Sequence, residues 1–147
     1  MTALCLSKRS VLPLVLFVLA LSAQAATVQE SLQAGYSALD AGNLDTAKAI
    51  FTQVAAEYSE TPQAAEAVWK LGYIAIKQKD DSLGKSHFQR VADSYPSSPK
   101  APDALLRLAY LASKGKSPET RNAFLEVARR YPDTPEAQLA KFRLARL

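Results

Sequence analysis

Cysteine and histidine are almost absent from this chain. Among its 147 residues, only Cys5 and His87 belong to these two types. A lone cysteine forms no intramolecular disulfide, and a lone histidine without nearby cysteines does not make a structural zinc site. Stability is therefore expected to come from packing, and no metal or thiolate chemistry is predicted.

Patterns typical of catalysis are missing as well. The chain shows no nucleophile beside a general base and no glycine loop suited to a phosphate. Asp80 and Asp81 are adjacent at a predicted helix start, where capping and the favourable field of the helix explain them. His87 lies beside Phe88 on a predicted helix and is expected at the surface or at the edge of the core. The sequence thus predicts no enzyme, no catalytic residue and no cofactor.

Charge of either sign is moderate, with a formal net charge of +4. Without Lys8 and Arg9, which belong to the predicted signal described below, the remaining 16 basic and 14 acidic groups give +2, and this value implies no nucleic acid or other polyanion as partner. The charges are unevenly spread, because residues 26–98 contain 6 basic and 9 acidic groups while residues 99–147 contain 10 and 5. Either the basic end attracts an acidic partner, or the split is ordinary solvated helix surface.

The first 25 residues follow the pattern of an export signal. A basic start, Lys8-Arg9, precedes the apolar run 11–21, and Ala23-Gln24-Ala25 offers small residues where a signal peptidase reads them. The run is too short to span a bilayer comfortably. We expect cleavage after Ala25, which would remove Cys5 and leave no membrane span; an uncleaved anchor is the alternative. The predicted domains are a signal peptide, 1–25, and a repeat domain, 26–147.

One sequence unit occurs three times in the predicted domain. Its copies begin at Phe51, Phe88 and Phe124, so the offsets are 37 and 36 residues. In each copy, apolar residues recur at spacings of three and four, as on one face of an amphipathic helix. A hydroxyl residue followed by proline then predicts the start of a second helix. These pairs are Thr61-Pro62, Ser98-Pro99 and Thr134-Pro135.

Small residues recur where two helices would have to approach closely. Short breaks at 41–43, 79–81 and 114–118 separate the helices of each pair, and Gly42 and Gly115 suit helix ends. A helical hairpin of this size cannot bury its apolar face alone, so repeated hairpins are expected to stack. The sequence predicts an all-α solenoid of about three hairpins and a C-terminal closing helix. The recurring small residues are Gly35, Gly72, Ala109 and Ala145.

The best-matched unit resembles the tetratricopeptide repeat. It carries Val68 at the first apolar place, then Leu71-Gly72, and later Phe88 and Pro96, whereas Ala75 and Gly84 replace the usual Tyr and Ala. The resemblance implies a right-handed solenoid and a non-catalytic role in protein binding. The style of the repeats resembles bacterial envelope proteins, namely Tol-Pal-associated division coordinators and outer-membrane assembly lipoproteins. Because the chain lacks the coiled coil of the former and the lipidated cysteine of the latter, it is equated with neither.

The resemblance implies that the first helix of each hairpin lines a concave groove. Tyrosines recur there every 37 residues, large apolar residues stand four positions earlier, and a basic row lies between them. Aromatic rings offer large contact areas at low entropic cost, which suits peptide recognition. The basic row could hold an acidic peptide or a C-terminal carboxylate. The predicted partner-binding residues are Leu32, Tyr36, Trp69, Lys70, Tyr73, Leu106, Arg107 and Tyr110.

Two structural alternatives remain open for these residues. The rings could simply pack between adjacent hairpins. Glu66 and Asp103 stand four residues before Lys70 and Arg107, where intrahelical ion pairs would occupy the basic side chains.

We expect a periplasmic module that binds a peptide or partner protein in the cell envelope, in assembly or division. The alternative is a structural subunit that associates with itself through its terminal helix. Lys141 weighs against this alternative, because apolar Val68 and Leu105 occupy the corresponding places in the other copies. The oligomeric state and the identity of the partner stay open.

Overall fold

The computed structural model describes residues 27–113 and 118–147, and this part of the chain consists of seven helices joined by short turns. An N-terminal helix covers residues 27–40. It is followed by α2 (Leu44–Glu57), α3 (Pro62–Lys77), α4 (Asp81–Ser94), α5 (Ala101–Ser113), α6 (Pro118–Arg130) and α7 (Pro135–Leu144). No strand occurs in these residues, so the expected all-α class is confirmed. The predicted signal peptide and Gly115 lie outside the described residues.

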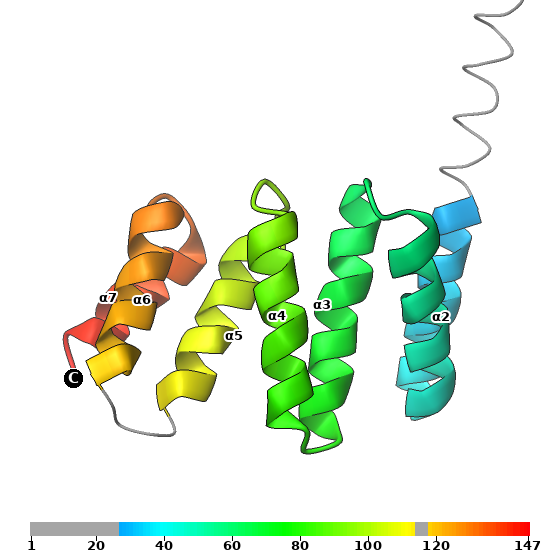
Figure 1. Cartoon of the computed structure of the whole chain (residues 1–147), viewed down its shortest axis with the longest axis horizontal. Coiled ribbons are helices and arrows are strands. Elements are labelled where there is room, and N and C mark those ends of the chain that lie inside the picture. The colour runs from blue at the N-terminus through cyan, green and yellow to red at the C-terminus, as the bar shows by residue number, and fades with distance from the viewer. Residues whose placement is uncertain (1–26, 114–117) are drawn as a thin grey trace, which may run out of the picture.

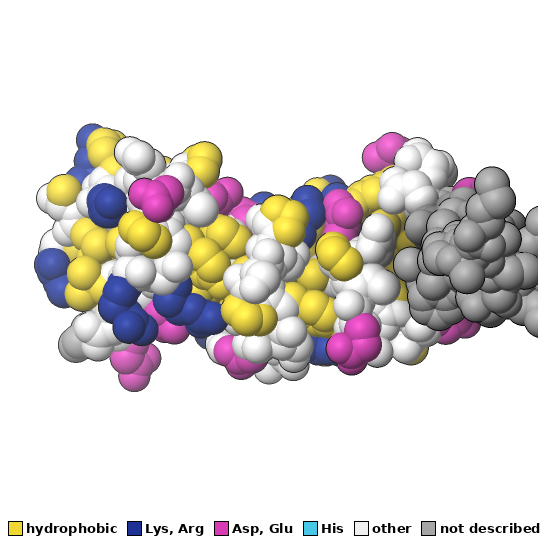
Figure 2. Space-filling view, turned by 90° about the horizontal axis from the view of Figure 1, so that it is seen from above, with side chains coloured by type: hydrophobic (Ala, Val, Ile, Leu, Met, Phe, Trp, Pro, Cys, Tyr) yellow, Lys and Arg dark blue, Asp and Glu magenta, His cyan; other side chains and the backbone are white. Residues whose placement is uncertain are grey.

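The helices form a solenoid of stacked hairpins (Figure 1). Each helix packs against the next along the chain, and α5 also contacts α7. The N-terminal helix lies behind α2 and α7 lies behind α6, so the first helices of the hairpins form one layer and α2, α4 and α6 the other (Figure 1). We call these the first layer and the second layer. Lys and Arg atoms gather over the end built by α6 and α7 (Figure 2), in line with the basic C-terminal part of the sequence.

The repeated phenylalanine is the centre of each hairpin. Phe51, Phe88 and Phe124 are at most 2% exposed. In the first two hairpins the ring lies directly against the predicted small residue, because a Cβ added to Gly35 or Gly72 would meet the facing ring at 2.7 or 2.8 Å. Real Cβ contacts are longer than this, so the small residues let the two helices of a hairpin approach.

The hydroxyl-proline pairs start two of the three helices as predicted. The side chains of Thr61 and Thr134 accept hydrogen bonds from the backbone N–H groups of Ala64 and Ala137, each at 3.3 Å. Both prolines stand at the beginning of their helix, where no N–H is needed.

The third start, Ser98-Pro99, is wrong by two residues, because α5 begins at Ala101. The cause is Pro102. In a helix beginning at Pro99, residue 102 would have to donate to the carbonyl of Ser98, and proline has no N–H. The bond to Ser98 comes instead from the Ala101 N–H, at 3.0 Å. The Ser98 hydroxyl accepts from the Lys100 N–H, at 3.2 Å.

The end of α3 differs from the corresponding end of the N-terminal helix. Gly42 has φ of 78°, and Lys79, which stands 37 residues later, has φ of 64°. Positive φ is unfavourable for a residue with a Cβ. Lys79 therefore adopts a strained backbone conformation where the first hairpin has a glycine.

Candidate functional site

Aromatic and basic side chains from four helices of the first layer form one continuous surface. The N-terminal helix contributes Tyr36, Lys100 lies just before α5, and α3, α5 and α7 contribute the others. Contacts between consecutive helices connect these side chains from one end of the stack to the other. We call this surface the aromatic–basic face. Its residues are Tyr36, Trp69, Lys70, Tyr73, Lys77, Lys100, Arg107, Tyr110 and Arg143.

Two predicted binding residues do not belong to this face. Leu32 is 1% exposed and Leu106 is 5% exposed, and both are part of the hydrophobic core. They share a register with Trp69, which is also part of the core but reaches a polar partner with its indole N–H. We therefore remove Leu32 and Leu106 from the candidate site, since a partner cannot reach them in this conformation.

Trp69 joins two hairpins and has little free surface. Its indole N–H donates to Asp103 Oδ2 at 2.6 Å, and its side chain is only 9% exposed. The guanidinium of Arg107 lies 4.6 Å from the ring centroid, an arrangement that favours the cation electrostatically. Trp69 thus packs between hairpins, as the structural alternative proposed, and its outer edge contributes to the aromatic–basic face.

The three tyrosines are more accessible than Trp69. Tyr36, Tyr73 and Tyr110 are all half-buried. Tyr73 is stacked on Trp69, with centroids 6.0 Å apart and planes 8° from parallel. Tyr36 and Tyr110 each contact the central phenylalanine of their hairpin edge to face, at 5.7 and 5.4 Å. Each tyrosine therefore packs on the protein with part of its surface, has a cation beside its ring, and stays partly exposed.

Lys70 lies among aromatic rings. Its Nζ is 4.6 Å from the ring centroid of Tyr36, 5.2 Å from that of Trp69 and 5.9 Å from that of Tyr73. Burial lowers the pKa of Lys70, and the nearby charge of Lys100 lowers it further. The protonated amine is therefore held in a site where it is only partly solvated.

The two carboxylates at this face connect adjacent hairpins. Glu66 accepts a hydrogen bond from the Tyr36 hydroxyl and forms an ion pair with Lys100 at 3.4 Å. Burial, followed by the bond to Glu66, raises the pKa of Tyr36.

Asp103 accepts from Trp69 and also from Arg107 Nε, at 2.8 Å. The expected intrahelical pair is thus present for Arg107, whereas Glu66 pairs with Lys100 of the next hairpin instead of Lys70.

Sequence reasoning missed Lys77 and Lys100 as members of this face. Lys77 Nζ lies 5.4 Å from the ring centroid of Tyr73, and Lys100 Nζ lies 5.4 Å from that of Trp69. The spacing of 37 residues between Glu66 and Asp103 could have indicated a repeated link between hairpins. Lys100 precedes α5, and no lysine stands at the equivalent position of the other copies, so no sequence pattern pointed to it.

The last helix continues the face with different chemistry. Arg143 Nε donates to the Tyr110 hydroxyl at 3.1 Å, and its guanidinium lies 5.1 Å from the Tyr110 ring centroid. Phe142 is 51% exposed, with the guanidinium of Arg146 at 4.2 Å from its ring centroid. The stack therefore ends in an aromatic and basic surface.

Other parts of the described chain offer less for function. In residues 27–113 and 118–147, no group of His, Cys, Asp and Glu could hold a metal ion. Asp80 caps α4 by accepting from the Leu83 N–H at 2.9 Å, as expected. His87 is half-buried, and burial, followed by the charges of Arg90 and Lys48, lowers its pKa. None of the helices in these residues is both long and apolar enough to cross a bilayer.

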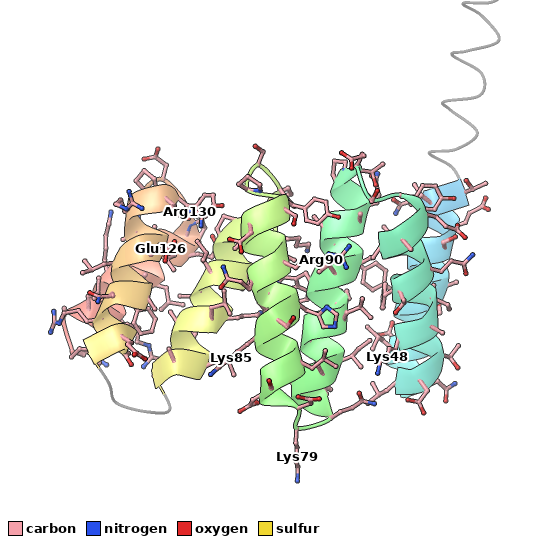
Figure 3. All side chains as sticks on the ribbon, viewed as in Figure 1. Lys48, Lys79, Lys85, Arg90, Glu126 and Arg130 are labelled. Atoms are coloured by element: carbon pink, nitrogen blue, oxygen red, sulfur yellow. The ribbon has the colours of Figure 1, made fainter. Side chains whose placement is uncertain are left out.

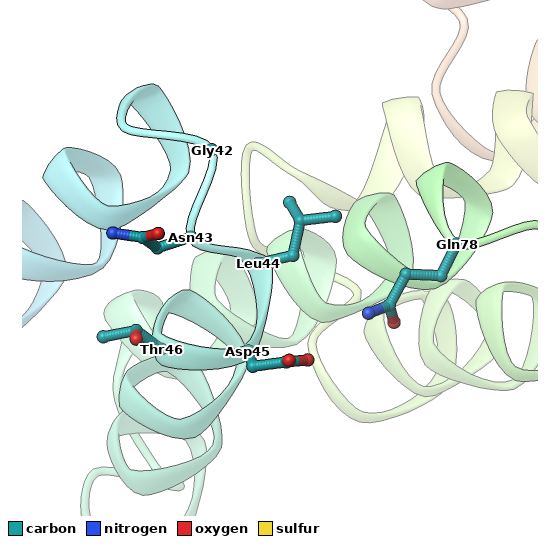
Figure 4. Close-up of a pocket in the computed structure, with 6 residues that line it drawn as sticks. All are labelled: Gly42, Asn43, Leu44, Asp45, Thr46 and Gln78. Carbon is teal, nitrogen blue, oxygen red and sulfur yellow. The ribbon is translucent and has the colours of Figure 1, made fainter.

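Hollows in the described part of the chain lie at turns and between α4, α5 and α6. One of about 420 Å³ is lined by the turn at 42–46 and by Gln78, whose side chain extends toward Asp45 (Figure 4). It is open, and no hydrophobic side chain other than Leu44 lines it. The outer surface of the second layer carries isolated charges such as Lys48, Lys85 and Arg90 (Figure 3). Aromatic and charged groups also meet there, as at Arg130 and Tyr131, but as a single pair and not as a row across several helices.

Comparison with known families agrees with this architecture. Tetratricopeptide repeat models match residues 32–99 and residues 103–134. The two matches together cover most of the chain, and the chain belongs to the tetratricopeptide repeat family. Its repeats define a module for protein–protein interaction. No curated protein sequence matches the chain.

Proposed function

We propose that this protein is a non-catalytic periplasmic module that binds a peptide segment of a partner protein on its aromatic–basic face. The supporting observation is the alignment of half-buried Tyr36, Tyr73 and Tyr110 on one layer of the stack, each with a cation beside its ring. Half-buried tyrosines are already ordered by packing, so little entropy is lost when they contact a ligand. The role of such a module is to bring together proteins of envelope assembly or division.

The proposed location rests on residues 1–25, which carry the pattern of a cleavable export signal. The style of the repeats, which resembles that of bacterial envelope proteins, supports the same compartment. An uncleaved anchor would hold the module at the membrane surface instead, with the same face available to a partner.

Peptide selection tests the proposed function. A phage-displayed library of random twelve-residue peptides is selected on the purified protein, and the selected peptides are then measured on two double variants. Tyr73→Ala with Tyr110→Ala removes two rings of the face, and each binding ring typically contributes about 2 kcal/mol. Binding should fall at least tenfold. The control, Lys48→Ala with Arg90→Ala, changes the second layer (Figure 3) and should bind as the unchanged protein does.

Two results would reject this function. The library could yield no peptide that binds above background. Alternatively, the selected peptides could bind equally well to the tyrosine variant, provided that circular dichroism shows both variants to be folded.

Self-association through α7 is a second candidate. It is favoured by three large apolar side chains of this end that are 40 to 59% exposed, namely Leu139, Phe142 and Leu147. The basic charge at this end could meet the acidic excess of the N-terminal part of a second copy. Sedimentation velocity should then show a concentration-dependent dimer that Phe142→Ser abolishes. A monomer at all concentrations would exclude this candidate.

A further inference from the structure

The charges of the aromatic–basic face do not balance. Its two carboxylates already have partners, since Glu66 contacts Tyr36 and Lys100 while Asp103 contacts Trp69 and Arg107. In contrast, Lys70 and Lys77 form no ion pair and no hydrogen bond with any side chain among residues 27–113 and 118–147. Of the three cations that remain, Arg143 donates to the Tyr110 hydroxyl, and the other two, Lys70 and Lys77, belong to α3.

These lysines flank Tyr73 on one side of α3. Positions 70, 73 and 77 are separated by three and four residues and so share one face of the helix. The Tyr73 ring centroid is 5.9 Å from Lys70 Nζ and 5.4 Å from Lys77 Nζ. The helix surface thus presents an ordered series of cation, ring and cation.

Aromatic rings stabilise the Lys70 ammonium, but no side-chain oxygen of the described residues accepts a hydrogen bond from it. Carboxylates form the strong, charge-assisted hydrogen bonds that such a group lacks. Burial and Lys100 lower the pKa of Lys70 more than the nearby carboxylates of Glu66 and Asp40 raise it, so a further negative charge would relieve a remaining cost. Lys77 is exposed, so it can bind a second carboxylate with little loss of solvation.

We propose that the aromatic–basic face selects acidic peptide segments, in which one carboxylate binds Lys70 and a second binds Lys77. This inference rests on the proposed function, and it specifies the class of peptide. Seven residues of helix separate the two lysines by about 10 Å along α3. A segment in the polyproline II conformation rises about 3.1 Å per residue with three residues per turn, so acidic residues at positions i and i+3 lie on one face about 9 Å apart. The backbone between them would lie over Tyr73.

The random library described above tests this specificity through the sequences that it yields. Selected peptides should contain Asp or Glu at positions i and i+3, and replacing either one with Asn or Gln should weaken binding at least tenfold. Affinity should also fall as salt is raised, because the contacts are ionic. Moving one acidic residue to position i+2 should weaken binding as well.

Variants of the protein identify the lysines. Lys70→Met and Lys77→Met should each bind the acidic peptides at least tenfold more weakly. Lys70→Arg keeps the positive charge and should therefore keep most of the affinity. The matched control is Lys85→Met on α4, in the second layer (Figure 3), which should not change binding. If Lys70→Met fails to fold, Lys77→Met and the Asn and Gln peptides decide the question, because Lys77 is exposed.

The outcomes separate this inference from the function on which it rests. The library could yield neutral or basic peptides that bind the unchanged protein but not the tyrosine variant. This result would leave the proposed function intact and overturn the acidic specificity. Acidic peptides that bind equally to both lysine variants would also overturn it. A library that yields no binding peptide would reject both.

Discussion

Replacing Gly72 with leucine places a side chain where the structure has only the ring of Phe88. The first added carbon alone would lie 2.8 Å from Phe88 Cε1 and 3.0 Å from Cδ1. Ordinary carbon contacts begin near 3.5 Å, so the overlap is more than half an ångström. Phe88 is 1% exposed and is enclosed by the core, so its ring cannot move aside without displacing its neighbours.

The cost can be estimated from these contacts. Inserting one carbon into a packed core costs about 1–3 kcal/mol, whereas replacing glycine with alanine inside a helix returns about 1 kcal/mol. Gly72→Ala should therefore lose about 1 kcal/mol of stability. Gly72→Leu adds three further carbons and should lose about 4 kcal/mol, out of roughly 5–15 kcal/mol for a domain of this size.

Urea unfolding followed by circular dichroism measures both variants. The matched control is Ala34→Leu, since Ala34 is exposed on the N-terminal helix and its replacement should change stability by less than about 0.5 kcal/mol. Phe88→Leu should partly rescue Gly72→Ala, because a smaller side chain releases the contact; a double-mutant cycle quantifies this coupling. Gly72→Leu with an unchanged urea midpoint would refute the role assigned to the small residues.

Three further predictions follow from separate features. Lys79→Gly should stabilise the protein by about 1 kcal/mol in urea unfolding, because glycine accepts the positive φ that Gly42 has at the same place; a loss of stability would contradict this. Trp69→Phe keeps an aromatic ring but removes the bond to Asp103, so it should cost about 1–2 kcal/mol by thermal unfolding, and an unchanged midpoint would show that this bond is dispensable. N-terminal sequencing of exported protein should begin at Ala26, whereas an intact Met1 would support the anchor.

The repeat made the architecture predictable from sequence. Phe51, Phe88 and Phe124 recur because each hairpin has the same centre, and Thr61 and Thr134 cap helices in the way that a hydroxyl before proline indicates. The start of α5 was mispredicted because Ser98-Pro99 was interpreted alone. Pro102, three residues later, decides where the helix hydrogen bonds can begin.

The candidate site was less predictable, because a register gives the direction of a side chain but not its burial. Leu32, Trp69 and Leu106 share one register, yet the leucines lie in the core while the indole reaches Asp103 in the next hairpin. That bond depends on how far apart the hairpins lie, which the sequence does not specify. Lys100 is a similar case, since it pairs with Glu66 across a distance of 34 residues in the chain.

The central claim is that the partner binds to the aromatic–basic face, and backbone NMR spectra of the protein titrated with a selected peptide test it most directly. The account predicts that the largest chemical-shift changes occur at Tyr36, Lys70, Tyr73 and Tyr110, in the first layer. Amides of the second layer, such as those of Lys48 and Arg90, should change little. Shifts concentrated on α2, α4 and α6, with the first layer unaffected, would contradict the account.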